Sequence, residues 1–290
     1  MSTIITTAFR GHLKTSRPRF WIYLLGPYLI GLVAWWWVTT PDQFIWLFSV
    51  QVVWFLVYFS YPANLLVYGV NDIFDYETDK LNDKKTWYEW LITPDMQKHL
   101  WSVIILLNIP FLLLSILPNA RSYIWLFVFV LSAVLYSAPP LRAKSKPVID
   151  TIISALIYIA PGYVWYYISW GVGFDRMIFV ALMGWNMAMH AYSAIPDIAS
   201  DIQAWIQTVA TRYGKTNTLL FCIACYLLAL ILAAPALGLF GIAIWSIYVL
   251  MMLISLKQDV FRLYTYFPWI NTTVGLLLFR YILLSQLGRL

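Results

Sequence analysis

Nine long apolar stretches constrain most strongly what this chain can fold into. They cover residues 20–38, 46–69, 99–117, 122–138, 148–169, 177–195, 217–234, 237–256 and 268–286. A bilayer span needs about 20 apolar residues, and 62% of the 290 residues are hydrophobic while only 11% are charged. Soluble domains do not have this composition. The sequence therefore predicts an all-α polytopic membrane protein with nine transmembrane helices, in a single domain that covers residues 1–290.

Basic residues are distributed unequally between the two ends of the predicted spans. Fifteen of the 19 Lys and Arg residues lie in the N-terminal tail and in loops that a nine-span topology places on the same face. Cytoplasmic loops carry such an excess, so the N-terminus is predicted to be cytoplasmic, in the cell (inner) membrane. No cleaved signal peptide is expected before the first span. The net charge of +6 suits membrane lipid headgroups, and no nucleic-acid-binding module is expected.

Five acidic residues follow the second apolar stretch within a few positions, in YGVNDIFDYETDKLNDKK at 68–85. Three of them, Asp72, Asp75 and Asp79, are spaced i, i+3, i+7. On a helix this spacing places all three on one face over two turns. The alternative is a solvated turn of mixed charge, since several lysines lie nearby.

A second acidic pair, Asp197 and Asp201, is spaced i, i+4 and follows Pro196 directly. This order predicts that the pair occupies the first turns of a helical segment, where the helix dipole tolerates anions. Like charges on one helix face repel each other, and a hard divalent cation removes the repulsion. Mg²⁺ is commonly held by one or two carboxylates plus substrate phosphate. Two such acidic helices around Mg²⁺ would form a receptor for a diphosphate on the cytoplasmic side.

A basic segment, YSAPPLRAKSK at 136–146, ends the fourth apolar stretch on the same predicted face. Its Arg142, Lys144 and Lys146 would bind phosphate oxygens and stabilise a departing diphosphate. The alternative interpretation is the ordinary excess of positive charge on a cytoplasmic face. His190 lies in a span near the second acidic pair, and it is interpreted as structural.

These motifs resemble those of the UbiA superfamily of intramembrane prenyltransferases. NDIFDYETD at 71–79 fits N-D-x-x-D-x-x-x-D, and DIASD at 197–201 fits D-x-x-x-D. The segment SRPRFWIYLLGPYLIG at 16–31 resembles the opening helix of that family, and YSAPPLRAKSKP resembles its central basic loop. The resemblance implies helices around a cavity open to lipid. It also implies Mg²⁺-dependent transfer of an isoprenyl group from its diphosphate to a lipophilic acceptor in the bilayer.

The resemblance also implies site residues and two Mg²⁺ ions. Carried over by position, one Mg²⁺ and the diphosphate are expected at Asn71, Asp72, Asp75 and Asp79, and the second Mg²⁺ at Asp197 and Asp201. Further diphosphate ligands are expected at Lys80, Asn82, Lys84, Tyr136, Arg142 and Lys144. The residues expected to be catalytic are Asp72, Asp75 and Asp197. No Ser/His/Asp arrangement is needed for this chemistry.

The acceptor is less constrained by the sequence. YGVNDIFDYETDKLNDKK and SAIPDIASD look most similar to the lycopene elongase branch, which adds five-carbon units to a carotenoid. A quinone precursor or a chlorophyllide-type acceptor is the alternative within the family. Trp205 stands where the family usually has Gly, so the acceptor pocket is expected to differ in shape. A divalent-cation transporter is the alternative of another class, but 11 of the 13 acidic residues lie at one predicted face.

Overall fold

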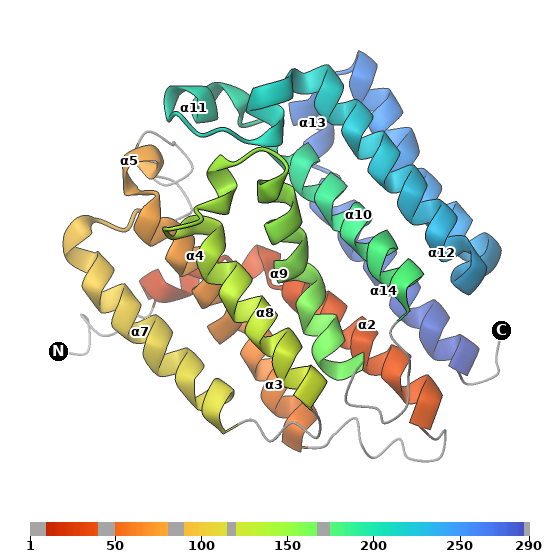
Figure 1. The fold of residues 1–290 in the computed structure, drawn as a ribbon, viewed down its shortest axis with the longest axis horizontal. Coiled ribbons are helices and arrows are strands. Elements are labelled where there is room, and N and C mark those ends of the chain that lie inside the picture. The colour runs from red at the N-terminus through yellow and green to blue at the C-terminus, as the bar shows by residue number, and fades with distance from the viewer. Residues whose placement is uncertain (1–9, 40–49, 81–89, 115–119, 167–174, 287–290) are drawn as a thin grey trace. The chain divides into compact units, whose positions relative to one another are not determined.

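The computed structural model describes residues 10–39, 50–80, 90–114, 120–166 and 175–286 (Figure 1). All regular elements in these ranges are helical. In chain order they are η1 (Pro18–Phe20), α2 (Ile22–Thr39), α3 (Val50–Ser60), α4 (Pro62–Phe74), α5 (Tyr76–Asp79), α7 (Pro94–Leu113), α8 (Ala120–Ser137), η3 (Ala143–Ser145), α9 (Ile149–Tyr166), α10 (Arg176–Ala194), α11 (Ile198–Gln203), α12 (Val209–Lys257), α13 (Val260–Tyr264) and α14 (Phe267–Gln286).

The all-α membrane prediction is confirmed by the length and composition of these helices. Each predicted span has a helix in its described residues. Among the described residues, five helical stretches are long and apolar enough to cross a membrane, namely Val50–Phe74, Pro94–Leu113, Ala120–Ser137, Val209–Lys257 and Val260–Ser285. Two further apolar stretches, Ile22–Ala34 within α2 and Ile149–Val164 within α9, also lie among the described residues. The protein is therefore an integral membrane protein, and the number of nine spans stays a prediction.

The longest helix, α12, corresponds to two predicted spans joined at a glycine. It has 49 residues, and at 1.5 Å per residue a straight helix of that length would measure about 73 Å, far beyond the roughly 30 Å hydrocarbon core. Gly238 interrupts it with φ 56 and ψ −148, a backbone conformation that is not helical. In Figure 1 the ribbon of α12 turns back on itself. The break coincides with the Pro-Ala-Leu-Gly turn that separates the eighth apolar stretch from the seventh.

Contacts between the helices divide the chain into two units. Unit 1 comprises residues 1–141, 160–172 and 279–290, and unit 2 comprises residues 142–159 and 173–278. The first acidic cluster belongs to unit 1, and the second acidic pair and the basic loop from residue 142 onward belong to unit 2. The expectation of a single domain stays a prediction.

In unit 1, the helix that carries the first acidic cluster is anchored at a proline break. α3 ends at Ser60 and α4 begins at Pro62, and the break leaves backbone carbonyl groups without helical donors. The side-chain amide of Asn64 donates to the carbonyl oxygens of Phe59 (2.7 Å) and Ser60 (2.8 Å). The Asn108 amide on α7 donates to the Pro62 carbonyl oxygen at 3.1 Å. Neighbouring polar groups thus provide hydrogen-bond donors to the interrupted backbone inside an apolar protein. Along its length, α4 packs against α7 and α8.

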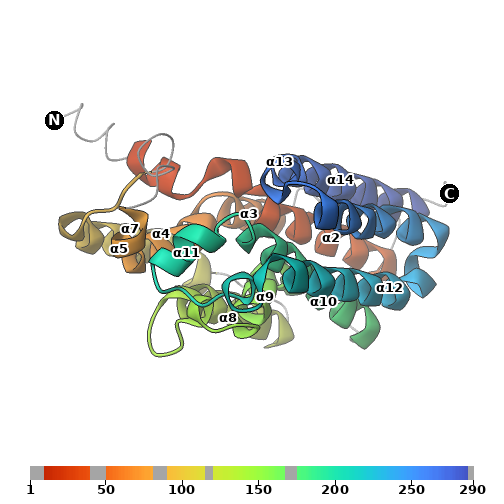
Figure 2. The ribbon, with the colours of Figure 1, turned by 90° about the horizontal axis from the view of Figure 1, so that it is seen from above.

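In unit 2, α10 lies along α12 in both ribbon views (Figures 1 and 2). Buried tyrosines join the helices at their polar ends. The Tyr192 hydroxyl lies 3.1 Å from Ser255 Oγ, and the Tyr248 hydroxyl donates to Asn271 Oδ1 at 3.0 Å. The short helix α11, which carries the second acidic pair, packs on α12. The position of that pair therefore depends on where α12 begins.

Candidate active site

The first acidic cluster lies where the membrane helix α4 ends. α4 stops at Phe74, and Asp75 has φ −110 and ψ 9, which is not helical. The backbone carbonyl oxygen of Asp75 accepts hydrogen bonds from Thr78 N (2.9 Å), Thr78 Oγ1 (2.8 Å) and Asp79 N (2.7 Å). These bonds start the one-turn helix α5. The helical spacing of Asp72, Asp75 and Asp79 is therefore interrupted at Asp75, whose carbonyl oxygen accepts the hydrogen bonds of Thr78 and Asp79 that form the new turn.

The three aspartates are nevertheless buried together along α4 and α5. Asp72, Asp75 and Asp79 are 1%, 7% and 9% exposed, whereas the side chain of Glu77 in the same segment is 77% exposed. A solvated turn would leave all four carboxylates in water. Burying a carboxylate is unfavourable unless cationic or hydrogen-bonding partners compensate. This part of unit 1 is therefore built to attract positive charge.

One such partner is Arg17, which sequence reasoning did not identify. Its Nη2 donates to Asp72 Oδ1 at 2.9 Å, and its guanidinium carbon lies 4.8 Å from the centre of the Tyr68 ring. Arg17 has a left-handed backbone (φ 51) directly before η1. The signal in the sequence was the segment SRPRFW at 16–21, but a contact between residues 55 positions apart cannot be read from spacing.

Asn71, the first residue of the predicted motif, contacts the end of α8. Its Oδ1 accepts a hydrogen bond from Ser137 Oγ at 3.1 Å. Tyr136, predicted to bind diphosphate, is half-buried in the same helical turn as Ser137. Unit 1 thus brings the end of α8 to the first acidic cluster, and Ser137 is a second contact that the sequence did not reveal.

The predicted diphosphate ligands after this cluster are only partly described. Lys80 is at the surface and forms an ion pair with Glu77. This hydrogen bond raises the pKa of Lys80 above its ordinary value, so the ammonium is charged at neutral pH. Asn82 and Lys84 lie outside the described residues.

In unit 2, the basic loop places its three cations in different environments. Arg142 is exposed and has a left-handed backbone (φ 42), and Lys144 is buried within η3. Lys146 is exposed. A buried lysine is unusual, so Lys144 differs from the solvated charges that merely orient a membrane protein.

The second acidic pair lies in the predicted kind of segment. α11 spans Ile198–Gln203 with Asp197 at its N-cap and Asp201 in its first turn. The backbone N–H of Asp201 donates to the Asp197 carbonyl oxygen at 2.9 Å. Both aspartates are half-buried. A helical segment beginning directly after Pro196 was predicted, and this prediction is confirmed.

Trp205 follows α11 in a backbone conformation that suits glycine. Its φ is 57, in the left-handed region, which a residue with a Cβ enters at a cost of roughly 1–2 kcal/mol. The side chain is 91% exposed, so packing inside the described protein does not offset this cost. The glycine expected at this position from the family resemblance therefore has a physical reason.

We expect Trp205→Gly to be more stable than Trp205→Ala by about 1 kcal/mol, because only alanine keeps a strained Cβ. Gln203, at the end of α11, provides the control. There alanine should be the better residue, by about 0.5–1 kcal/mol. The measurement is the unfolding midpoint of the purified variants, and equal stabilities at position 205 would contradict the left-handed assignment.

The oxygen donors of the first cluster fit a hard divalent cation. Three buried carboxylates and the Asn71 amide provide the ligand type that Mg²⁺ prefers. Within the described ranges, no three His, Cys, Asp or Glu side chains, those of Asp72, Asp75 and Asp79 included, are grouped closely enough to form a metal-binding cluster by themselves. Mg²⁺ does not require one, because it keeps several waters and takes oxygens from substrate phosphates. The residues present therefore suit a metal ion that arrives with a diphosphate.

Comparison with known proteins agrees with this geometry. The model of the UbiA prenyltransferase family matches residues 24–268. A lycopene elongase/hydratase of Halobacterium salinarum is 37% identical over 273 residues, which cover 92% of this chain and 95% of that protein. A lycopene elongase/hydratase of Haloferax volcanii is 36% identical over 266 residues, which cover 91% of this chain and 85% of that protein.

Solved structures show the same fold. A UbiA homolog from Archaeoglobus fulgidus, bound to DMAPP and Mg²⁺, superposes with a TM-score of 0.72. It is 20% identical, and the match covers 97% of this chain and 100% of that one. The family match, the curated relatives and the helical membrane architecture lead to one conclusion: the chain belongs to the UbiA prenyltransferase family and is a lycopene elongase-like prenyltransferase of the membrane.

Proposed function

We propose that this protein uses Mg²⁺ to transfer a dimethylallyl group from its diphosphate to lycopene or a related carotenoid. The observation that carries the proposal is the burial of Asp72, Asp75 and Asp79 at the break between α4 and α5. The cytoplasmic side of the inner membrane is the proposed location of the N-terminus and of both acidic motifs, as the distribution of Lys and Arg predicts.

The proposed roles follow the chemistry of the side chains. Asn71, Asp72, Asp75 and Asp79 hold one Mg²⁺ and the diphosphate, and Asp197 and Asp201 hold a second Mg²⁺. Lys80, Asn82, Lys84, Tyr136, Arg142 and Lys144 bind diphosphate oxygens. When bound, Mg²⁺ neutralises the diphosphate and makes it a better leaving group. Three of the described ligands of the first motif, Asp72, Asp75 and Asp79, are buried, and this burial supports their assignment to the metal.

The reaction breaks one bond and forms another. The C1–O bond of the donor breaks, and its electron pair leaves with the diphosphate, whose developing charge the basic side chains stabilise. The allylic carbon then bonds to an end alkene of the acceptor. The resulting cation either loses a proton to give an alkene, or takes up water and then loses a proton to give an alcohol. Because water would also trap the first cation, the site has to exclude it until the acceptor has reacted.

The acceptor assignment is supported by the relatives rather than by the geometry. The curated proteins at 36% and 37% identity are called lycopene elongase/hydratase. An aromatic quinone precursor or a chlorophyllide-type molecule is the alternative acceptor for a protein with these motifs.

Pigment analysis of lycopene-accumulating cells tests the proposal. Expression of the protein should convert lycopene into products that are one or two five-carbon units heavier by chromatography and mass spectrometry. Asp75→Asn is the control and should leave lycopene unchanged. If cells containing folded protein show unchanged lycopene, the carotenoid acceptor is wrong. Prenyl transfer would then be assayed with aromatic acceptors.

A further inference from the structure

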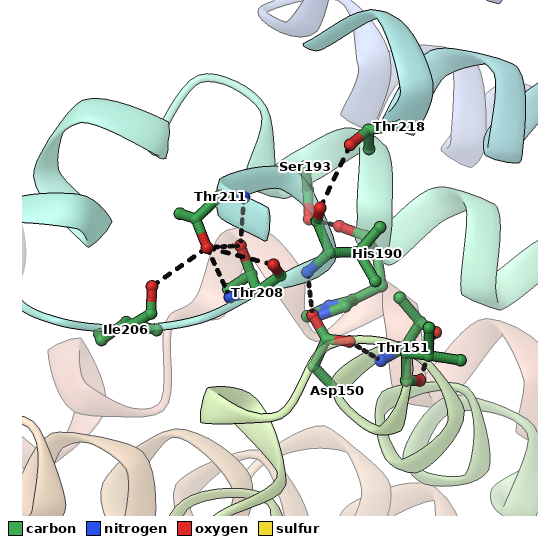
Figure 3. A network of polar contacts seen from close by, with 10 residues as sticks. Asp150, Thr151, His190, Ser193, Ile206, Thr208, Thr211 and Thr218 are labelled. Atoms are coloured by element: carbon green, nitrogen blue, oxygen red, sulfur yellow. Dashed lines mark hydrogen bonds and ion pairs between the residues drawn. The ribbon is translucent and has the colours of Figure 1, made fainter. Parts of the chain in front are cut away.

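Asp150 is a buried carboxylate in unit 2 to which the proposed reaction gives no role. It is the second residue of α9 and has no exposed surface. Its Oδ1 accepts a hydrogen bond from Thr151 N at 2.8 Å, and its Oδ2 accepts one from Val209 N at 3.1 Å. His190 Nε2 on α10 lies 4.0 Å from the same Oδ2, within ion-pair distance. Asp150 therefore contacts two other helices of its unit (Figure 3).

The bond to Val209 fixes the point at which α12 begins. Val209 is the first residue of that helix, and the first N–H groups of a helix have no partner within it. The Asp150 carboxylate satisfies one of them. The helical turn that begins at Val209 extends to Gly214, where the backbone is not helical (φ 75, ψ 172), and the long part of α12 follows. Thr208 and Thr211 complete the cap, since Thr208 Oγ1 accepts from Thr211 N at 3.2 Å and Thr211 Oγ1 accepts from Thr208 N at 2.8 Å.

Hydrogen bonds continue from this cap to the second acidic pair. Thr211 Oγ1 shares its one proton between the carbonyl oxygens of Ile206 and Thr208, each at 3.1 Å. Ile206 N in turn donates to the Asp201 carbonyl oxygen at 2.9 Å. Two hydrogen bonds thus connect the start of α12 to Asp201, and a third connects the start of α12 to Asp150.

Asp150 also contacts the chain on the other side of the same segment. His190 precedes residues 191–208, which contain α11 and both aspartates, and Val209 follows them. One buried carboxylate therefore lies against the helix that leads into this segment and against the first peptide of the helix that leads out of it. Removing the Asp150 carboxylate would therefore release the start of α12, which is hydrogen-bonded to Asp201 through Ile206.

We infer that Asp150 is a positioning residue, which holds Asp197 and Asp201 in place for the second metal ion by fixing the start of α12. This inference rests on the proposed function, in which that pair binds metal. It predicts that changes at Asp150 weaken the second ion and leave the first one in place. Metal sites typically lose roughly 10–100-fold in affinity when a residue that orients a ligand is replaced.

The test counts Mn²⁺ ions bound to the full-length protein in lipid nanodiscs with inorganic diphosphate. Free Mn²⁺ is measured by electron paramagnetic resonance. The unmodified protein should bind two ions, and Asp150→Ala should weaken the second by roughly 10–100-fold. Asp150→Asn keeps one acceptor oxygen, so its affinity for the second ion should lie between those of the unmodified protein and of Asp150→Ala. Hydrogen exchange across residues 197–208 should become faster in the same order.

Asp175 offers a matched control in the same unit. Its carboxylate caps α10 by accepting hydrogen bonds from Met177 N (2.9 Å) and Ile178 N (3.1 Å). Asp175→Ala removes a helix cap of the same chemistry at the opposite end of α10 from His190. This variant should lower the stability of the protein without changing its affinity for the second Mn²⁺ or the rate of hydrogen exchange in residues 197–208.

The outcomes separate the two proposals. Asp201→Asn should itself weaken the second ion, and if it does not, or if the unmodified protein binds fewer than two ions, the proposed metal role of this pair fails. If Asp201→Asn weakens the ion while both Asp150 variants behave like Asp175→Ala, the positioning role fails. Should Asp150→Ala not fold, the Asp150→Asn variant and His190→Gln decide the question by the same two measurements.

Discussion

Asp75→Asn is expected to lower the rate of prenyl transfer at least about 100-fold while leaving the protein folded. The backbone contacts that Asp75 makes through its carbonyl oxygen, to Thr78 and Asp79, are unchanged by this substitution. Asparagine has the same shape as aspartate but no charge, so it is a weaker ligand for a hard cation such as Mg²⁺. The estimate follows because loss of a direct ligand exceeds the 10–100-fold effect of losing a residue that only orients one.

The measurement is the initial rate of product formation by the purified protein at saturating Mg²⁺ and dimethylallyl diphosphate. Asp95→Asn is the matched control, since Asp95 is an exposed carboxylate in the first turn of α7 in the same unit. It should retain the rate of the unmodified protein. A rate above one tenth of normal for Asp75→Asn would exclude Asp75 as a metal ligand.

Excess Mg²⁺ separates binding from catalysis in the same assay. If Asp75 contributes mainly affinity, raising Mg²⁺ should recover part of the lost rate. If it also aligns the diphosphate for C1–O cleavage, the rate should stay low at every Mg²⁺ concentration. The burial of Asp75 at a break between two helices favours the second result, because the surrounding backbone holds its position.

The acidic sites could be located from the sequence because carboxylates are rare in this chain. In a protein with 11% charged residues, Asp72, Asp75 and Asp79 stand out directly after an apolar helix. The three aspartates are buried and Glu77 is exposed, although the helix that the spacing requires is broken at Asp75. Pro196 likewise marks the start of α11 correctly, since it stands directly before the N-cap residue Asp197.

Other features of the site could not be predicted, because they depend on contacts between distant residues. No sequence pattern pairs Arg17 with Asp72 or Asn71 with Ser137, which are 55 and 66 positions apart. The break at Asp75 was also missed, since it depends on the Thr78 side chain binding the Asp75 carbonyl. Periodicity describes one helix at a time. It contains no information on which side chains of two different helices come into contact.

Gly31 is another residue in unit 1 whose contact with a distant helix could not be predicted from the sequence. Its substitution is expected to have a large effect on stability. A Cβ at Gly31 on α2 would lie 2.1 Å from the carbonyl oxygen of Gly162 on α9, and a Cβ at Gly162 would lie 2.8 Å from the Pro27 carbonyl oxygen. Two helix backbones therefore touch without side chains between them, as small residues allow in membrane proteins. Neither glycine differs in sequence from those that have open space around them.

Gly31→Ala is expected to destabilise the protein by about 2–3 kcal/mol, because the added methyl meets backbone that cannot move aside as a side chain can. Gly26→Ala in the same helix is the matched control. Its Cβ would meet only Ile22 Cδ1, at 4.0 Å, so alanine should stabilise α2 there by about 0.5–1 kcal/mol. Unfolding in increasing sodium dodecyl sulfate, followed by circular dichroism, measures both variants. Opposite shifts of the midpoint are expected, and a Gly31→Ala variant as stable as Gly26→Ala would show that α2 and α9 are not in backbone contact.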